Sequence, residues 1–141
     1  MKNPLQSYPG YLLRRAAISR LAELEKRIEP LGLSVTEASI LALVEHNPGI
    51  SQAECGRLLS IQRPNLNPIM RRLVERGLVV PSPGPGRVQH LALSPEGRDL
   101  TLRAIAEFEA HEQRIFDAVP AHLRDELVPL LIALWAPEPG P

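Results

Sequence analysis

Asparagine and arginine side chains recur within one short stretch of this 141-residue chain, between Arg63 and Arg76. Both residue types carry planar hydrogen-bonding groups that match base edges in the major groove of DNA, and arginine also binds phosphate. Residues 57–90 hold six arginines and one acid, a net charge of +5, although the whole chain has a net charge of zero. This local charge predicts a phosphate-binding surface, with a solvated arginine-rich helix face as the alternative. The candidates for base or phosphate contact are Arg63, Asn65, Asn67, Arg71, Arg72 and Arg76.

The sequence contains no recognisable catalytic or metal-binding arrangement. The four histidines and the single cysteine, Cys55, are scattered without metal-ligand spacing. His111-Glu112 begins like a zinc-protease motif, but Ile115 occupies the position of the second histidine. We therefore expect no enzymatic activity, no cofactor and no metal. We interpret Cys55 as a buried, inert thiol, with a peroxide sensor as the alternative.

Cysteine content and hydropathy also bear on where the protein works. One cysteine can form no internal disulfide, which is typical of a reducing compartment. The first ten residues lack the apolar core of a signal peptide, and the longest apolar run, residues 127–137, is too short to span a membrane. We expect a soluble, cytoplasmic protein without a membrane partner.

The stretch from Arg63 to Arg76 has the apolar spacing of a helix with one buried stripe. Pro64 falls near its first position, and Pro68 is expected to distort its first two turns without breaking them. The predicted buried stripe consists of Leu66, Ile69, Met70, Leu73 and Val74.

Two capping boxes, each Ser-x-x-Glu, precede this helix at Ser34 and Ser51. They predict one helix from residue 35 to about His46 and a short second helix over residues 52–59. Two apolar strand patterns, residues 78–80 and 88–93, follow the arginine-rich helix around a Pro/Gly tip at residues 81–86. Helix, turn, helix and hairpin predict a winged helix-turn-helix domain over residues 33–94.

Long apolar helices are predicted on both sides of this domain, over residues 11–29, 95–119 and 121–135, the last with a kink at Pro129. The simplest way to bury their apolar stripes is against the same helices of a second copy. We therefore predict a mainly α-helical homodimer with a small β-hairpin wing. Residues 1–32 and 95–136 would form the helical dimerisation region, and residues 137–141 a disordered tail. Such a dimer would place two recognition helices ~34 Å apart on DNA.

The residues from Leu31 to Leu100, above all LVERGLV followed by the wing and LALSPEG, resemble the MarR family of bacterial winged helix-turn-helix transcriptional regulators. The resemblance covers nearly the whole chain. It implies a homodimer that binds a pseudo-palindromic operator in double-stranded DNA. It also implies release by a small-molecule effector, often aromatic and anionic.

The wing departs from the family pattern at one position. Family wings usually carry Asp-x-Arg near the tip, and the arginine enters the minor groove. Arg87 matches this arginine and becomes a further DNA-binding candidate, but Pro85 occupies the aspartate position. The pair that normally orients the arginine is therefore missing.

The resemblance places the effector cavity between the first helix and the winged-helix domain. A cation beside an aromatic ring suits an aromatic carboxylate, whereas an intersubunit or surface ion pair is the alternative for the arginines. His46 ends the next helix and could border the same cavity, or it could simply bind the helix C-terminus. The effector-binding candidates are Tyr8, Tyr11, Arg14, Arg15 and His46.

The sequence as a whole predicts a ligand-responsive DNA-binding transcriptional regulator, and a repressor rather than an activator. Two other functions stay open. One is a ligand-independent DNA-binding or architectural dimer, and the other is a winged-helix module that contacts proteins.

Overall fold

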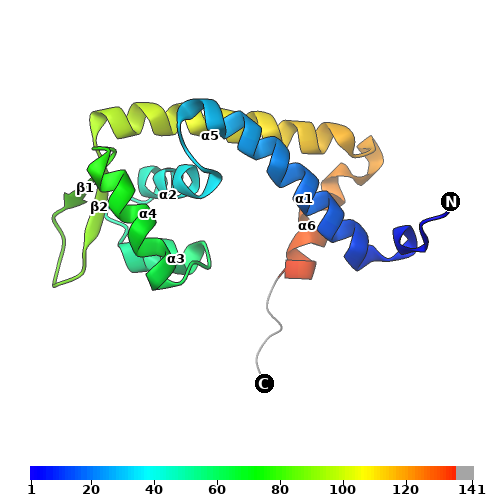
Figure 1. Ribbon diagram of the computed structural model, residues 1–141, viewed down its shortest axis with the longest axis horizontal. Coiled ribbons are helices and arrows are strands. Elements are labelled where there is room, and N and C mark those ends of the chain that lie inside the picture. Colours follow the sequence, from blue (N-terminus) through cyan, green and yellow to red (C-terminus); the bar gives the residue numbers. More distant parts are fainter. Residues whose placement is uncertain (136–141) are drawn as a thin grey trace, which may run out of the picture. The chain divides into compact units, whose positions relative to one another are not determined.

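The computed structural model describes residues 1–135, which fall into two compact units, 1–108 and the chain from Glu109 onward (Figure 1). Residue 136 and the predicted tail 137–141 lie outside the described residues. The first unit contains η1 (Pro4–Ser7), α1 (Pro9–Ile28), η2 (Glu29–Leu31), α2 (Val35–His46), α3 (Gln52–Leu58), α4 (Arg63–Glu75), β1 (Val79–Ser82), β2 (His90–Leu93) and the start of α5 (Pro95–Ala118). The second unit contains the end of α5, η3 (Ala121–Leu123) and α6 (Arg124–Trp135).

Both predicted capping boxes are formed. At α2, the Glu37 N–H donates to the Ser34 hydroxyl oxygen at 3.1 Å, and the Ser34 N–H donates to the Glu37 carboxylate at 3.0 Å. Ser51 and Glu54 make the same pair of bonds at α3, at 3.2 and 2.8 Å. The bond from the Ser51 backbone, together with one from its hydroxyl, lowers the pKa of the Glu54 carboxyl. The predicted start of each helix is therefore confirmed.

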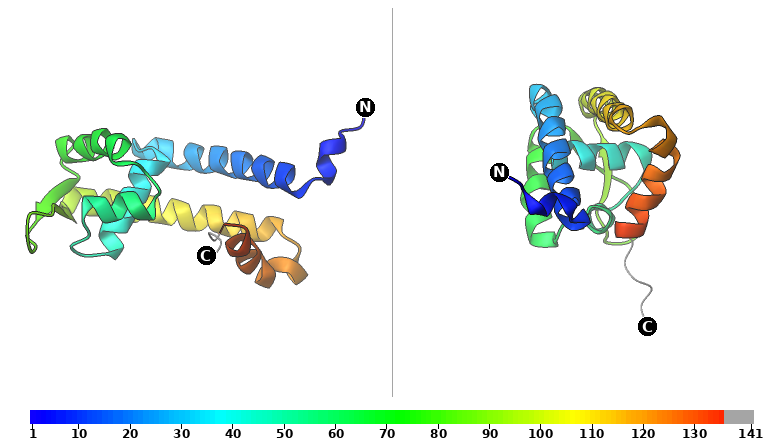
Figure 2. Two further views of the ribbon diagram at one scale, coloured as in Figure 1. Left: turned by 90° about the horizontal axis from the view of Figure 1, so that it is seen from below. Right: turned by 90° about the vertical axis from the view of Figure 1, so that its right-hand side faces the viewer.

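The core of the first unit is built around α2. Ile40 and Leu41 are completely buried, and they belong to one apolar cluster with Leu66 and Leu73 from α4 and Leu91 from the hairpin. The views in Figure 2 show α2, α3, α4 and the hairpin grouped together. The predicted range of the winged-helix domain, 33–94, thus lies inside the first unit, and the dimerisation region stays a prediction.

The predicted stripe of α4 is largely confirmed, because Leu66, Met70 and Leu73 are buried and Ile69 is half-buried. Val74 was predicted to be buried, but it is 43% exposed. It lies seven positions after Asn67, on the same exposed flank of the helix. The helix continues through Pro68 as predicted.

The wing is an antiparallel hairpin in which Val79 pairs with Leu93 and Ser82 with His90. β1 extends through Pro81 and Ser82, so the loop is shorter on that side than predicted. On the other side, the regular strand begins at His90 rather than at residue 88. β1 pairs only with β2, so it is an edge strand that tolerates a proline.

The wing is also joined to the chain just before α3. Ser51 forms an isolated antiparallel bridge with His90, and the Leu91 N–H donates to the Ile50 carbonyl at 3.0 Å. The Gln52 N–H donates to the Gln89 carbonyl at 3.3 Å. The start of α3 and the base of the wing therefore form one hydrogen-bonded unit.

In the second unit, the helix predicted over residues 121–135 is divided. Residues 121–123 form the 3₁₀ helix η3, and α6 starts at Arg124, whose Nε donates to the Val119 carbonyl at 2.9 Å. α6 continues through Pro129, and the kink there stays a prediction. Among residues 1–135, no helix has the length and apolarity needed to cross a membrane.

Gly97, in the first turn of α5, allows a close approach to the backbone of Leu78. A Cβ atom added at Gly97 would overlap the Leu78 carbonyl group, whereas one added at Gly10, in the first turn of α1, meets nothing within 4 Å. We predict that Gly97→Ala lowers the free energy of unfolding by about 1–3 kcal/mol, because the crowding outweighs the helix propensity of alanine.

Gly10→Ala is the matched control, and it should leave stability unchanged or raise it by up to about 1 kcal/mol. Urea denaturation of the two variants measures the difference. Equal stability of the two alanine variants would contradict the packing described at Gly97.

Candidate nucleic-acid interface

The polar residues of α4 lie along two different lines of the helix. Arg63, Asn67 and Arg71 are spaced four residues apart and share one line. Asn65, Arg72 and Arg76 share a second line, because they are spaced seven and four residues apart. All six are exposed, but their surroundings differ.

Arg63 and Asn67 of the first line border a hollow of about 380 Å³ between α3, α4 and the wing, which we call the wing groove, whereas Arg71 is not among its lining residues. The wing groove brings together Arg63, Asn67 and Arg87, three residues predicted to bind DNA that come from two separate parts of the sequence. The lining residues are Gln52, Ala53, Arg63, Leu66, Asn67, Arg87, Val88 and Gln89. Arginines on two walls make this groove suitable for a polyanion.

Gln52 belongs to the wing groove, although the sequence did not single it out. Its Nε2 amide donates to Oδ1 of Asn67 at 2.7 Å. In the sequence, Gln52 could be read only as the second residue of a capping box. Its position at the first turn of α3, facing the next helix of a helix-turn-helix unit, is the signal that could have identified it.

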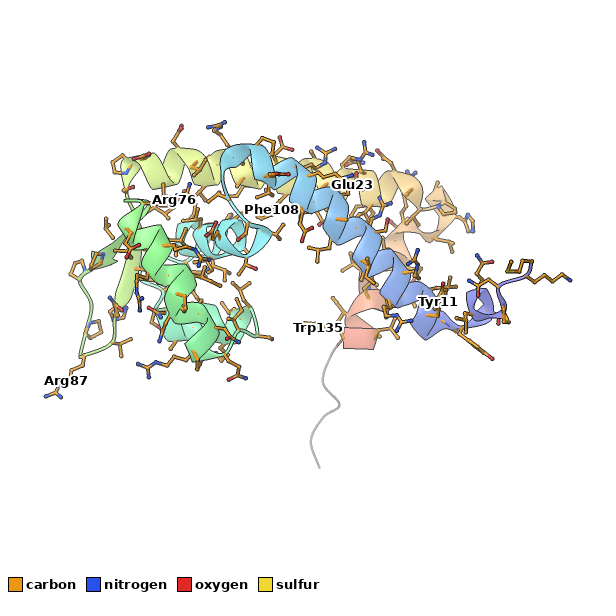
Figure 3. The ribbon with its side chains drawn as sticks, in the orientation of Figure 1. Tyr11, Glu23, Arg76, Arg87, Phe108 and Trp135 are labelled. Atoms are coloured by element: carbon orange, nitrogen blue, oxygen red, sulfur yellow. The ribbon has the colours of Figure 1, made fainter. Side chains whose placement is uncertain are left out.

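The wing tip is held by a histidine rather than by the usual aspartate–arginine pair. Nδ1 of His90 lies 2.7 Å from the Gly49 carbonyl oxygen, and Nε2 lies 3.4 Å from the Pro85 carbonyl oxygen. Gly84 packs so closely on the imidazole that an added Cβ atom would overlap the ring. Arg87 extends from the wing tip, whereas Arg76 lies at the C-terminal end of α4, away from that tip (Figure 3).

Two members of the second line, Arg72 and Arg76, pair with a carboxylate of α2. Nε of Arg72 lies 3.3 Å from one carboxylate oxygen of Glu37, and Nη1 of Arg76 lies 3.9 Å from the other. Arg76 also donates to the Gly32 carbonyl at 2.8 Å. The Glu37 side chain is only 10% exposed, so these arginines neutralise a largely buried charge. The structure therefore does not bring Arg72 and Arg76 to the wing groove.

Two of the five predicted effector-binding residues, Tyr11 and Arg14, are in contact with each other. The Arg14 guanidinium lies 5.9 Å from the centre of the Tyr11 ring, a cation–π contact. The Asn3 amide donates to the Tyr11 hydroxyl at 3.3 Å. Tyr8 and Arg15 are exposed beside them.

The fifth predicted effector-binding residue, His46, has a local partner instead. Its Nδ1 lies 2.9 Å from the Ala42 carbonyl in the last turn of α2, which agrees with the alternative of a helix C-terminal contact. A hollow of about 370 Å³ near the start of α2 has a mixed lining of two glutamates, two hydroxyl residues and three apolar residues, namely Glu25, Glu29, Ser34, Thr36, Leu21, Leu33 and Val35. None of the five predicted residues lines it.

Cys55 is completely buried. Burial, with a smaller effect from the Glu54 charge, raises the pKa of the Cys55 thiol to about 11. The thiol therefore stays protonated at neutral pH, as expected of an inert cysteine. Among residues 1–135, no three His, Cys, Asp or Glu side chains are grouped to hold a metal ion.

Comparison with known proteins identifies relatives over most of the chain. A family model described as "MarR family" matches residues 31–88. The HTH-type transcriptional repressor Rv2887 of Mycobacterium tuberculosis is 32% identical over 124 residues, which cover 86% of this chain and 89% of the repressor.

Solved structures of two such repressors share the fold. The repressor CouR of Rhodococcus jostii RHA1, bound to a 23-mer DNA duplex, superposes with a TM-score of 0.84 at 30% identity, over 95% of this chain and 97% of CouR. CouR bound to p-coumaroyl-CoA gives a TM-score of 0.84 at 26% identity, over 99% and 100% of the two chains. Rv2887 in complex with p-aminosalicylic acid gives a TM-score of 0.71 at 30% identity, over 89% and 97%.

The contacts of Glu37 generate a prediction about stability. Glu37→Gln should lower the free energy of unfolding by about 1–3 kcal/mol. A neutral amide cannot balance the charges of two arginines, and it accepts a hydrogen bond from the Ser34 N–H less strongly than a carboxylate does. The matched control is Glu45→Gln. Glu45 pairs with a single exposed arginine, Arg98, at 3.1 Å and caps no helix. Chemical denaturation should show a clearly smaller loss for Glu45→Gln, and equal losses would contradict the special position of Glu37.

Proposed function

The chain belongs to the MarR family of transcriptional regulators, and we propose that it is a DNA-binding repressor. It acts as a homodimer on a pseudo-palindromic operator and is released by an aromatic, anionic effector. The observation that carries this proposal is the wing groove, which brings Arg63 and Asn67 of α4 together with Arg87 of the wing. A repressor of this kind works in the cytoplasm, where its DNA is.

In the proposed complex, α4 enters the major groove with the line Arg63, Asn67 and Arg71 toward the DNA. Arg87 approaches the minor groove, whose negative potential attracts arginine. The similarity to CouR, whose structure contains a DNA duplex, supports DNA binding. Asn65 lies on the second line of α4 and stays a candidate for a DNA contact. Arg72 and Arg76 would have to leave Glu37 to reach DNA, so we assign them the role of positioning α4.

The proposed homodimer rests on apolar side chains that are exposed in a single copy of the chain. On α1, Leu13 is 42% exposed, Ile18 is 56% exposed and Leu21 is 49% exposed. On α6, Leu134 is 69% exposed and Trp135, labelled in Figure 3, is 79% exposed. Covering such faces with a second copy removes apolar surface from water. A two-fold dimer then presents two copies of α4 to successive turns of DNA.

The proposed effector site is built on Tyr11 and Arg14, with Tyr8, Arg15 and His46 as further candidates. A guanidinium beside an aromatic ring suits an aromatic carboxylate, which can stack and form charge-assisted hydrogen bonds. The ligands of the relatives, p-aminosalicylic acid and p-coumaroyl-CoA, are aromatic and anionic. Release would follow from linkage, in which the effector favours a dimer with the wrong spacing of α4 at a coupling energy of about 1–3 kcal/mol.

The DNA-binding part of this proposal predicts a steep dependence on salt. Three arginine–phosphate contacts per protomer, from Arg63, Arg71 and Arg87, give a dimer a slope of about −5 in a plot of log affinity against log salt. Arg71→Ala should reduce the slope by about 2, since each dimer loses two contacts. Fluorescence anisotropy with a duplex selected from a random-sequence pool measures both values.

Arg103→Ala, which changes an exposed arginine of α5, is the control and should keep the wild-type slope. A protein-interaction module would bind no duplex at all. A flat salt dependence in the wild type would also contradict the proposal.

The effector part predicts that p-aminosalicylate weakens the complex with DNA, whereas an uncharged aromatic amide of the same size does not. Arg14→Ala should abolish the response but leave the affinity for DNA without effector unchanged. Anisotropy titrations of the preformed complex measure both effects. If a panel of aromatic acids changes neither the affinity for DNA nor the melting temperature, the ligand-independent DNA-binding dimer becomes the better description.

A further inference from the structure

Asn67 is the asparagine of α4 that lines the wing groove, and its side chain is already engaged by another amide. Gln52 donates from Nε2 to Oδ1 of Asn67 at 2.7 Å. Gln52 is itself fixed from a second side, because its backbone N–H donates to the Gln89 carbonyl of the wing. α3, α4 and the wing therefore meet at Gln52.

This hydrogen bond leaves the two side chains with complementary groups. Asn67 keeps both amide hydrogens as donors, and Gln52 keeps its carbonyl oxygen as an acceptor and one amide hydrogen as a donor. Reversing the direction of the bond would exchange these roles between the residues. The pair would still offer both a donor and an acceptor in either case.

Adenine is the base that matches both groups in the major groove. Its N7 accepts a hydrogen bond and its N6 amino group donates one. Guanine offers only acceptors, which would leave the Gln52 carbonyl oxygen without a partner. Thymine offers one acceptor and a methyl group, and cytosine offers one donor, so neither base uses both a donor and an acceptor of the pair. A lone asparagine can bind adenine with its own two groups, but the bond from Gln52 occupies one of the two lone pairs of Oδ1 of Asn67.

We propose that Gln52 and Asn67 act as one base-reading unit that selects adenine in the major groove. Arg63, which lines the same groove, binds a flanking phosphate and holds the unit in register. This inference rests on the proposed DNA-binding function. It adds Gln52, a residue of α3, to the groups that determine operator sequence, and it names the base that these groups select.

The experiment begins with selection from a pool of random duplexes by the wild type and by Gln52→Met. Methionine keeps the length of the side chain but has no amide groups. We expect the wild type to enrich adenine at one position of each half-site, and Gln52→Met to lose enrichment at that position alone. Affinity of the variant for the wild-type operator should fall about tenfold, with little change on an operator in which that A·T pair is replaced by G·C.

A double-mutant cycle tests whether the two residues form one unit. Gln52→Ala and Asn67→Ala should each cost about tenfold in operator affinity. The double variant should cost about tenfold as well, rather than about a hundredfold, because both changes remove the same interaction. Gln62→Ala is the matched control, since Gln62 is an exposed glutamine of the same helix-turn-helix unit whose side chain caps nothing. It should keep wild-type affinity and sequence preference.

The outcomes separate the inference from the function on which it rests. A wild-type protein that selects no sequence would overturn the proposed DNA-binding function, and this inference with it. A wild-type preference that survives in Gln52→Met, or additive losses in the cycle, would overturn the inference alone. Equal losses on the operator and on the altered duplex would also overturn it, because Gln52 would then bind only backbone. Melting temperatures of the variants identify any loss that is due to unfolding.

Discussion

The buried carboxylate of Glu37 is the interaction on which the orientation of α4 depends. It closes the capping box of α2 with Ser34, and it pairs with Arg72 and Arg76 of α4. A charge that is nine-tenths buried costs several kcal/mol unless it stays paired. Arg72 and Arg76 must therefore stay beside the Glu37 carboxylate, and this position sets the rotation of α4 about its own axis. With one flank held in this way, the opposite flank is the one that borders the wing groove.

The same cluster connects the recognition helix to the end of α1. Arg76 donates to the carbonyl of Gly32, a residue in the left-handed conformation (φ 70°) just after η2. A displacement of the α1–α2 junction would therefore change a direct hydrogen bond to α4. For the proposed effector response, this contact is a physical route from the helical flank to the DNA-binding surface. At the other end of α4, Gln52 ties the helix to the wing, so both ends are fixed by polar contacts around an apolar core.

Much of the fold follows from local signals in the sequence. The capping boxes at Ser34 and Ser51 predict helix starts because their hydrogen bonds are formed between residues three apart. The apolar stripe of α4 follows from helical periodicity.

The site was less predictable, because Glu37 and Arg72 are 35 residues apart and only the folded chain shows that they pair. Periodicity placed asparagines and arginines on one polar side, but it could not separate the flank that faces α2 from the flank that faces the wing. Gln52 and His90 were missed for the same reason, since their partners come from other elements.

Arginine-specific labelling tests the division of α4 into two flanks most directly. Phenylglyoxal modification, read by mass spectrometry with and without an operator duplex, reports the accessibility of each guanidinium group in one experiment. We expect DNA to protect Arg63, Arg71 and Arg87, whereas Arg72 and Arg76 should react equally slowly in both conditions because Glu37 holds them. Protection confined to Arg72 and Arg76, or no protection of Arg63, Arg71 and Arg87, would contradict the proposed division of α4.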